Sequence, residues 1–238
     1  MSKHIELLRF LKIAGIPILL YLSFIFRIVN AQRIGTARAK KGSVLDIVCS
    51  QKGAKDLKIR NKTESWGAVS IALHWLTAAV VVGLFALGLW MVDLGYHSAW
   101  SYRGPHTHKG VGLLLFGLTL ARLAWRLSHR GPDPPEGQTR MEIAAARTVH
   151  ALLYLLLFAV MASGYLISTA DGRPVSVFGW VDVPAVWHGP NNQADVAGRL
   201  LRVLAAVLMA TALLHALAAL KHHIFDKDAT LKRMLGRQ

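Results

Sequence analysis

The sequence predicts an all-α integral membrane protein, a four-helix bundle, on three observations. Of its 238 residues, 53% are hydrophobic and only 17% are charged, whereas about 25% are charged in an ordinary soluble domain. The apolar residues gather in four long runs, none with the strict apolar–polar alternation that is typical of a half-buried strand. With its flanks, each run reaches the roughly 20 residues that a helix needs to cross the bilayer core.

The four membrane helices are expected at residues 68–92, 109–128, 146–168 and 198–221. Glycine and prolines just after the second helix break the chain before the third. A longer connection, about 169–197, separates the third and fourth helices and combines glycine and proline with valine and tryptophan. Because aromatic side chains favour the headgroup level, this connection is expected to lie on the membrane surface.

The charge balance gives the orientation and excludes one class of partner. Lys and Arg number 28 against 13 Asp and Glu, a net charge of +15. A basic chain with long apolar runs is typical of a membrane protein with cationic inner loops, so no nucleic-acid partner is expected. Most Lys and Arg outside the helices precede the first helix, follow the second or follow the fourth. Both ends of the four-helix core are therefore predicted to face the cytoplasm.

Residues 1–57 form an N-terminal extension with one apolar segment, Ile13–Phe26, and residues 58–238 form the membrane domain. Three interpretations of the extension remain open. It is a cleaved signal peptide, since basic residues precede the apolar run and Val29-Asn30-Ala31 follows it. It is a fifth membrane segment, or it results from a gene start placed too early. The many basic residues between the apolar segment and the core favour the third interpretation.

Histidine occurs in, or at the end of, each expected helix, at His74, His108, His150 and His215. Ionisable groups inside a membrane are costly, roughly 2.5–3.5 kcal/mol for a full charge, and need partners. A single one is usually a hydrogen-bonded core histidine, but four together favour a cofactor, because paired histidines from facing helices hold haem or metal in bundles. His74 and His215 are expected within about 10 Å of the same face and could share one iron; His108 lies at the other face.

Two further groups of residues suit a haem beside the helices. Arg122 and Arg126, at the inner end of the second helix, could pair with haem propionates or extend to the cytoplasm instead. Glycines on the first two helices would allow a flat ring to approach closely, or would serve helix packing. These are Gly83, Gly88, Gly110, Gly112 and Gly117.

Several motifs resemble those of the bacterial cytochrome b561 family. They are Trp66-Gly-Ala-Val-Ser-Ile-Ala-Leu-His74-Trp75, His108-Lys109-Gly110-Val111-Gly112, Ala121-Arg122-Leu-Ala-Trp-Arg126-Leu, His150-Ala-Leu-Leu-Tyr154, Gly164 to Arg173, and Leu214 to His223 with the segment after it. The resemblance covers about Lys58 to Arg237. It implies a four-helix inner-membrane protein with two b-type haems, which transfers electrons between the quinone pool of the respiratory chain and another redox partner.

The resemblance also implies a set of ligands. His74 and His215 would hold the inner haem, and His108 would hold the outer one. The family's second outer ligand is a histidine 14 residues before the inner one, where this chain has Leu201. The outer haem is then lost, held by His108 alone, or completed by another residue; His188 is one candidate, and His97 and His106 are weaker ones. His150 is expected near haem or quinone, in a structural or propionate-contact role.

Two function classes follow. The first is a haem b electron-transfer protein that works with quinone, and the family includes superoxide oxidation with quinone as acceptor. Basic residues near the outer face could attract an anion such as superoxide. They are Arg173, Lys109, Arg199 and Arg202. The alternative is a non-redox membrane protein, a transporter or scaffold that has kept the fold and lost the haem, for which Leu201 is the only support.

Overall fold

The computed structural model describes residues 60–94, 98–187, 189 and 191–237. The chain divides into two units, Met1–Ala54 and Lys55–Gln238, and all described residues belong to the second unit. The expectations for residues 1–57, and those for His97 and His188, therefore fall outside the described residues.

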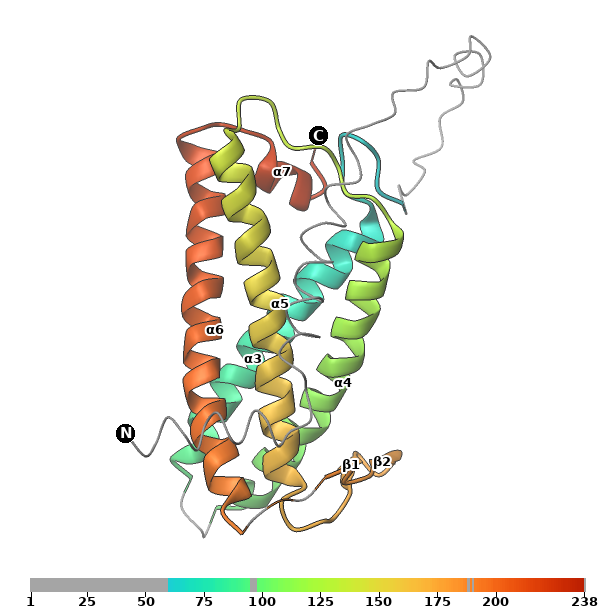
Figure 1. Cartoon of the computed structure of the whole chain (residues 1–238), viewed down its shortest axis with the longest axis vertical. Helices are drawn as coiled ribbons and strands as arrows, with labels where there is room; N and C mark the ends of the chain where they lie inside the picture. The colour runs from blue at the N-terminus through green and yellow to red at the C-terminus, as the bar shows by residue number, and fades with distance from the viewer. Residues whose placement is uncertain (1–59, 95–97, 188, 190, 238) are drawn as a thin grey trace. The chain divides into compact units, whose positions relative to one another are not determined.

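Four long helices make up the membrane domain, and each is long and apolar enough to cross a bilayer. They are α3 (Ala68–Val92), α4 (Trp100–Ser128), α5 (Arg140–Ser168) and α6 (Gln193–Ile224). The helices run alternately up and down, with α3 packed mainly on α4 and α5 mainly on α6 (Figure 1). The predicted four-helix membrane bundle is confirmed.

Three of the expected helix starts were placed too late. α4 begins at Trp100 rather than at 109, α5 at Arg140 rather than 146, and α6 at Gln193 rather than 198. Apolar runs mark only the part of a helix in hydrocarbon, whereas the backbone turns begin earlier, among polar residues. At α5 the Thr139 hydroxyl accepts the Glu142 N–H, and the Glu142 carboxylate accepts the Thr139 N–H, a complete capping box.

A β-hairpin lies within the connection that was expected to be only a surface loop. Strand β1 (Val175–Val177) pairs antiparallel with β2 (Val181–Val183). Phe178 and Gly179, at the turn, both have positive φ, and the Trp180 N–H donates to the Val177 carbonyl at 2.9 Å. Two successive positive φ angles match the right-handed twist of a hairpin. This turn directs the Phe178 ring onto Gly110 of α4, where a Cβ atom would lie 2.8 Å from the ring.

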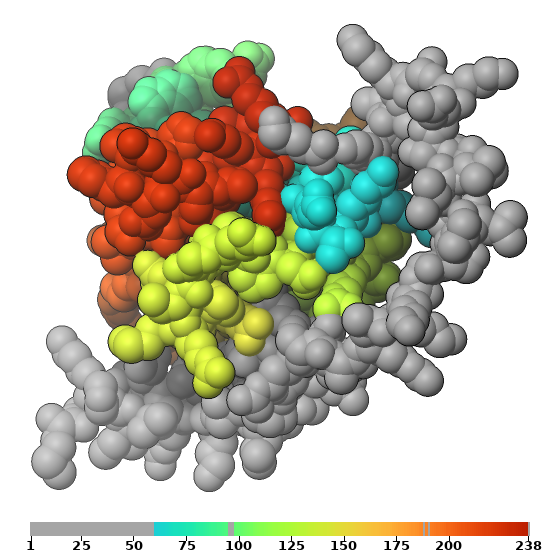
Figure 2. Space-filling model, turned by 90° about the horizontal axis from the view of Figure 1, so that it is seen from above, coloured from blue at the N-terminus to red at the C-terminus, as the bar shows by residue number. Residues whose placement is uncertain are grey.

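The two ends of the bundle differ. The start of α3, the end of α4, the start of α5 and the end of α6 lie at the same end of the bundle as the short helix α7 (Thr230–Met234), here called the α7 end (Figure 1). The opposite end carries β1 and β2 and is called the hairpin end. Viewed from the α7 end, the C-terminal segment lies beside the connection between α4 and α5 (Figure 2). That connection also packs against the start of α3, where Gly131 faces the Trp66 ring.

The buried core is small for a chain of this length. Its centre is formed by Leu115 of α4, Leu156 and Leu157 of α5 and Leu208 of α6. Many large apolar side chains of the four helices are exposed instead, among them Leu89, Leu114 and Leu213. An outward-facing apolar surface around a helical bundle is what lipid covers, since hydrocarbon tails are as apolar as leucine.

Candidate functional site

Three histidines from three helices meet toward the α7 end. The ring centroids of His74 on α3 and His215 on α6 lie 6.4 Å apart, with the rings 69° from parallel. His150 of α5 lies closer still to His215, at 5.0 Å between centroids. His74 and His215 were expected at the same depth, and the structure places their rings next to each other. His150 joins them from inside α5, nearly three turns beyond the helix start rather than at it.

The spacing of these rings fits one iron between His74 and His215. A metal–imidazole bond is about 2 Å long, so two imidazoles on opposite sides of one iron have centroids about 6 Å apart. The 6.4 Å separation of His74 and His215 matches this value. The 5.0 Å separation of His150 and His215 is too short for the same arrangement. The donor set therefore fits a haem held by His74 and His215, with His150 as a close neighbour.

Two arginines and a tyrosine complete this cluster. The Arg122 guanidinium donates to Nδ1 of His74 at 2.8 Å, so its side chain points into the bundle. The guanidinium carbons of Arg122 and Arg126 lie 5.5 and 5.9 Å from the centroid of the Tyr154 ring. Tyr154 is buried. It was not among the predicted site residues, although its position four residues after His150 on one helix face was a usable signal.

Among the described histidines, His108 lies apart from these three, toward the hairpin end. Its ring rests on Gly88 of α3, where a Cβ atom would approach His108 Cε1 to 3.3 Å. The Nδ1 atom of His108 is buried, and within the described part of the chain it has no hydrogen-bond partner. Since α4 begins at Trp100, His108 lies two turns inside the helix rather than at its start. A buried, unpaired ring nitrogen beside a glycine suits a second haem ligand.

The residues around His108 bear on the missing ligand. Leu201 of α6 is half-buried and offers no ligand atom. His106, one of the suggested substitutes, packs its ring against Tyr102 and Phe178, at 6.2 and 6.1 Å between centroids. Two residues along a helix also turn a side chain by about 200°, so His106 and His108 point in nearly opposite directions. His106 is therefore not placed to share a ligand site with His108.

The glycines expected to admit a flat ring divide into two groups. At Gly88 and Gly110 the space that a Cβ would fill is taken by the rings of His108 and Phe178. At the other three positions no neighbouring side chain of the described residues lies within 4 Å of that space. These are Gly83, Gly112 and Gly117.

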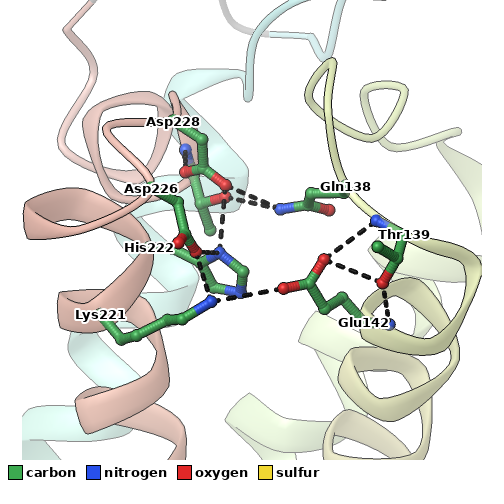
Figure 3. Close-up of polar contacts among 8 residues, drawn as sticks. Gln138, Thr139, Glu142, Lys221, His222, Asp226 and Asp228 are labelled. Carbon is green, nitrogen blue, oxygen red and sulfur yellow. Dashed lines mark hydrogen bonds and ion pairs between the residues drawn. The ribbon is translucent and has the colours of Figure 1, made fainter.

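A polar cluster ties the C-terminal segment to α5 at the α7 end (Figure 3). Lys221 Nζ lies 2.7 Å from the Asp226 carboxylate and 3.4 Å from that of Glu142. His222 Nδ1 lies 2.8 Å from Asp226 and 3.3 Å from Asp228. The structure thus places the His222 ring against two carboxylates. Lys221 therefore bridges the carboxylates of Glu142 on α5 and Asp226 after α6.

Asp228 is held by hydrogen bonds within this cluster. Burial by itself would raise the pKa of the Asp228 carboxyl, but hydrogen bonds from the Thr230 backbone N–H and from Gln138 Nε2 outweigh it, and the pKa lies below its ordinary value. The Gln138 bond, 2.9 Å long, crosses from the connection before α5 to the segment after α6. The charged form of Asp228 is thus part of what holds the C-terminal segment in place.

At the hairpin end, one of the basic residues suggested to attract anions is already paired. Arg173 Nε donates to the Asp171 carboxylate at 2.6 Å. These hydrogen bonds lower the pKa of Asp171 and raise that of Arg173. The positive charge of Arg173 is therefore neutralised locally.

Comparison with known proteins agrees with this architecture. The family model described as prokaryotic cytochrome b561 matches residues 65–237. Cytochrome b561 homolog 2 of Escherichia coli K12 is 49% identical over 181 residues, which cover 76% of this chain and 96% of that protein. Cytochrome b562 of Cereibacter sphaeroides is 32% identical over 173 residues, 70% of this chain and 92% of that protein. A probable superoxide oxidase of Yersinia pestis is 26% identical over 177 residues, 74% and 98% respectively. The chain belongs to the prokaryotic cytochrome b561 family and is a membrane b-type cytochrome.

Proposed function

We propose that this protein carries electrons between a membrane quinone and a second redox partner, through a b-type haem held by His74 and His215. The observation that carries the proposal is the 6.4 Å separation of these two rings, which come from the first and last membrane helices. His150, Arg122 and Arg126 surround this pair, and His108 marks a second position toward the hairpin end.

The chain's residues have separate tasks in this site. His74 and His215 each offer one neutral ring nitrogen, while the other ring nitrogen is left for a hydrogen bond that orients the ring. Arg122 and Arg126 supply positive charge that suits the two haem carboxylates. A bound b-type haem supplies reversible one-electron chemistry at its iron. A haem held by both His74 and His215 would carry electrons without binding oxygen or other small ligands.

The surroundings of the site favour a quinone as one partner. Quinones dissolve in the bilayer, and many large apolar side chains of the four helices face outward, where lipid and quinone lie. The His74–His215 pair lies within the membrane spans rather than in a water-exposed loop. A lipid-soluble partner therefore reaches the neighbourhood of the site without leaving the membrane.

Superoxide is one candidate for the electron donor, because a relative is named a probable superoxide oxidase. Lys109, Arg199 and Arg202 lie toward the hairpin end and are the basic residues that would attract this anion. Arg173 contributes less because Asp171 pairs with it. Superoxide added with quinone should then reduce the quinone, and superoxide dismutase should abolish that reduction.

The ligand assignment is tested with two variants and one control. His74→Ala and His215→Ala should each lose one haem per chain by pyridine haemochrome assay, and both should unfold at lower temperature because haem binding stabilises the native state. His129→Ala is the matched control, since His129 stacks on Trp125 at 3.7 Å near the end of α4. Full haem content and an unchanged reduced spectrum in both variants would show that the pairing is wrong.

Electron transfer to quinone and the orientation of the chain need separate measurements. The purified protein, reduced by dithionite and freed of excess reductant, should be reoxidised on adding a short-chain quinone, as followed by its visible absorption. A colourless preparation would favour the non-redox alternative.

Alkaline phosphatase fused after residue 237 should be inactive in cells, because it works only outside the cytoplasm and the C-terminus is proposed to lie inside.

A further inference from the structure

The hydrogen bond between Arg122 and His74 determines where the proton of His74 lies. An arginine guanidinium has only N–H donors and no acceptor. The Nδ1 atom of His74, 2.8 Å from Arg122 Nη2, must therefore accept with its lone pair. A neutral imidazole carries one proton, so the proton of the His74 ring lies on Nε2.

Iron coordination needs a different arrangement of the same ring. If iron binds Nε2, that nitrogen must give up its proton, and a neutral ring then carries the proton on Nδ1. Nδ1–H and the Arg122 N–H would be two donors facing each other. If iron binds Nδ1, it takes the lone pair that Arg122 uses. The Arg122 hydrogen bond and an iron bond to His74 are therefore mutually exclusive.

We propose that Arg122 competes with iron for His74, so that haem binding at this site proceeds only as Arg122 leaves the ring. This inference rests on the proposed function, which makes His74 a haem ligand. Iron binding at Nε2 would move the single ring proton from Nε2 to Nδ1 through water, break the hydrogen bond to Arg122 and form one iron–nitrogen bond, so the ring would be neutral before and after.

Neighbouring groups support this role for Arg122. Its guanidinium carbon lies 5.5 Å from the centre of the Tyr154 ring, whose face attracts cations, so the released side chain has a second contact close by. Arg122 also satisfies a ring nitrogen of His74 inside a membrane helix, where an unpaired polar atom is costly. Arg126 makes the same kind of contact with Tyr154, at 5.9 Å, one turn further along α4.

The tautomer of His74 is the first test. The full chain is labelled with ¹⁵N-histidine, purified without haem in lipid nanodiscs and examined by NMR, with the His74 signal identified by its loss in His74→Gln. The expected wild-type signal is that of a ring protonated on Nε2. Arg122→Met should shift His74 away from this tautomer, and Arg126→Met should leave it unchanged. A wild-type His74 protonated on Nδ1 would overturn the proposal.

The rate of haem uptake is the second test. Arg122→Met should take up added haemin faster than the wild type by about tenfold, the factor expected for one lost hydrogen bond to a charged group. Arg122→Gln, a polar variant that retains a hydrogen-bonding side chain and accommodates either tautomer, should do the same. Arg126→Met should be no faster than the wild type, because it loses positive charge without releasing His74.

The outcomes separate this inference from the proposed function. Equal uptake rates in the wild type and both Arg122 variants would refute the competition alone. Failure of every form of the chain, wild type included, to take up haem with a bis-histidine spectrum would refute the proposed function and the competition with it. Faster uptake in Arg122→Met and Arg122→Gln, with the shifted tautomer, supports both.

Discussion

The indole N–H of Trp75 on α3 donates a 3.0 Å hydrogen bond to the backbone carbonyl of Met234 on α7, 159 positions further along the chain. Trp75 directly follows His74, and the two rings meet edge-on at 5.4 Å between centroids. Arg233 of α7 also donates to the backbone carbonyl of Asp133, at 2.7 Å. The C-terminal segment is thus joined both to the helix that carries His74 and to the connection between α4 and α5.

Replacing Trp75 by Phe should loosen this attachment. Phe keeps an aromatic ring beside His74 but cannot donate to Met234, and a lost hydrogen bond of this kind destabilises by about 1 kcal/mol. Limited proteolysis should cleave residues 225–237 faster in Trp75→Phe than in the wild type. Trp180→Phe, at the exposed hairpin turn, is the control and should not change the cleavage rate. Equal rates in all three proteins would contradict the role of Trp75.

Replacing Leu201 by His should change the haem count or spin state. The unmodified chain is expected to hold either one haem or two, with one of the two high-spin and able to bind carbon monoxide. Fourteen residues along a helix turn by forty degrees less than four full turns, so a histidine at 201 points to nearly the same side as His215. Leu201→His should then show a second low-spin haem by electron paramagnetic resonance. Two low-spin haems in the wild type would instead indicate another ligand, such as His188.

Residues 1–57 should be dispensable for the membrane domain. The family model begins at residue 65, and the resemblance in sequence begins at about Lys58. A chain starting near Arg60 should insert into the membrane and contain the same amount of haem as the full chain, measured per milligram of membrane domain. A colourless or uninserted product would show that the N-terminal extension is required by the fold.

The attachment of the C-terminal segment should depend on acid pH through Asp228. Because hydrogen bonds hold the pKa of Asp228 below its ordinary value of 3.8 in the folded chain, its ionised form contributes stability at higher pH. Hydrogen bonds to a charged group contribute about 1 to 2 kcal/mol. This contribution to stability is lost as the pH falls below the pKa of Asp228 in the unfolded chain and then through its lower pKa in the folded chain.

Hydrogen exchange of residues 225–237 between pH 7 and pH 3 measures this effect. After correction for intrinsic exchange, protection in the wild type should fall at the acid end. Asp228→Asn should be less protected at pH 7 and should show a smaller change with pH. Asp182→Asn, at the hairpin end, should behave like the wild type. If Asp228→Asn has the same pH profile as the wild type, Asp228 does not hold the segment.

Local sequence patterns predicted much of the membrane fold. The helix starts and the hairpin that they missed have physical reasons. The span of α3 was predicted at its observed bounds, because there the apolar run and the helix coincide. The starts of α4, α5 and α6 were missed because turns with polar residues extend each helix beyond its apolar run, and only at α5 does a side-chain cap mark the start. The hairpin was missed because its strands are three residues each and depend on Phe178 adopting a positive φ.

The sequence by itself determined the number of membrane helices in the described part of the chain and the shared depth of His74 and His215. Both follow from properties along the chain. An apolar run as long as the bilayer core is thick predicts a membrane helix, and the rise per residue gives the depth of a side chain within that helix. The relative height of His74 and His215 could be stated without knowing how the helices pack.

Only the tertiary structure decided which side chains meet at a given height. The rotation of each helix about its axis and its choice of neighbour depend on side chains from other helices, which no local pattern records. For that reason the sequence left two roles open for Arg122, pairing with a haem propionate or extending to the cytoplasm. The structure instead shows its guanidinium donating a hydrogen bond to His74 Nδ1. The same packing brings His150 within 5.0 Å of His215 and sets His222 against Asp226 and Asp228.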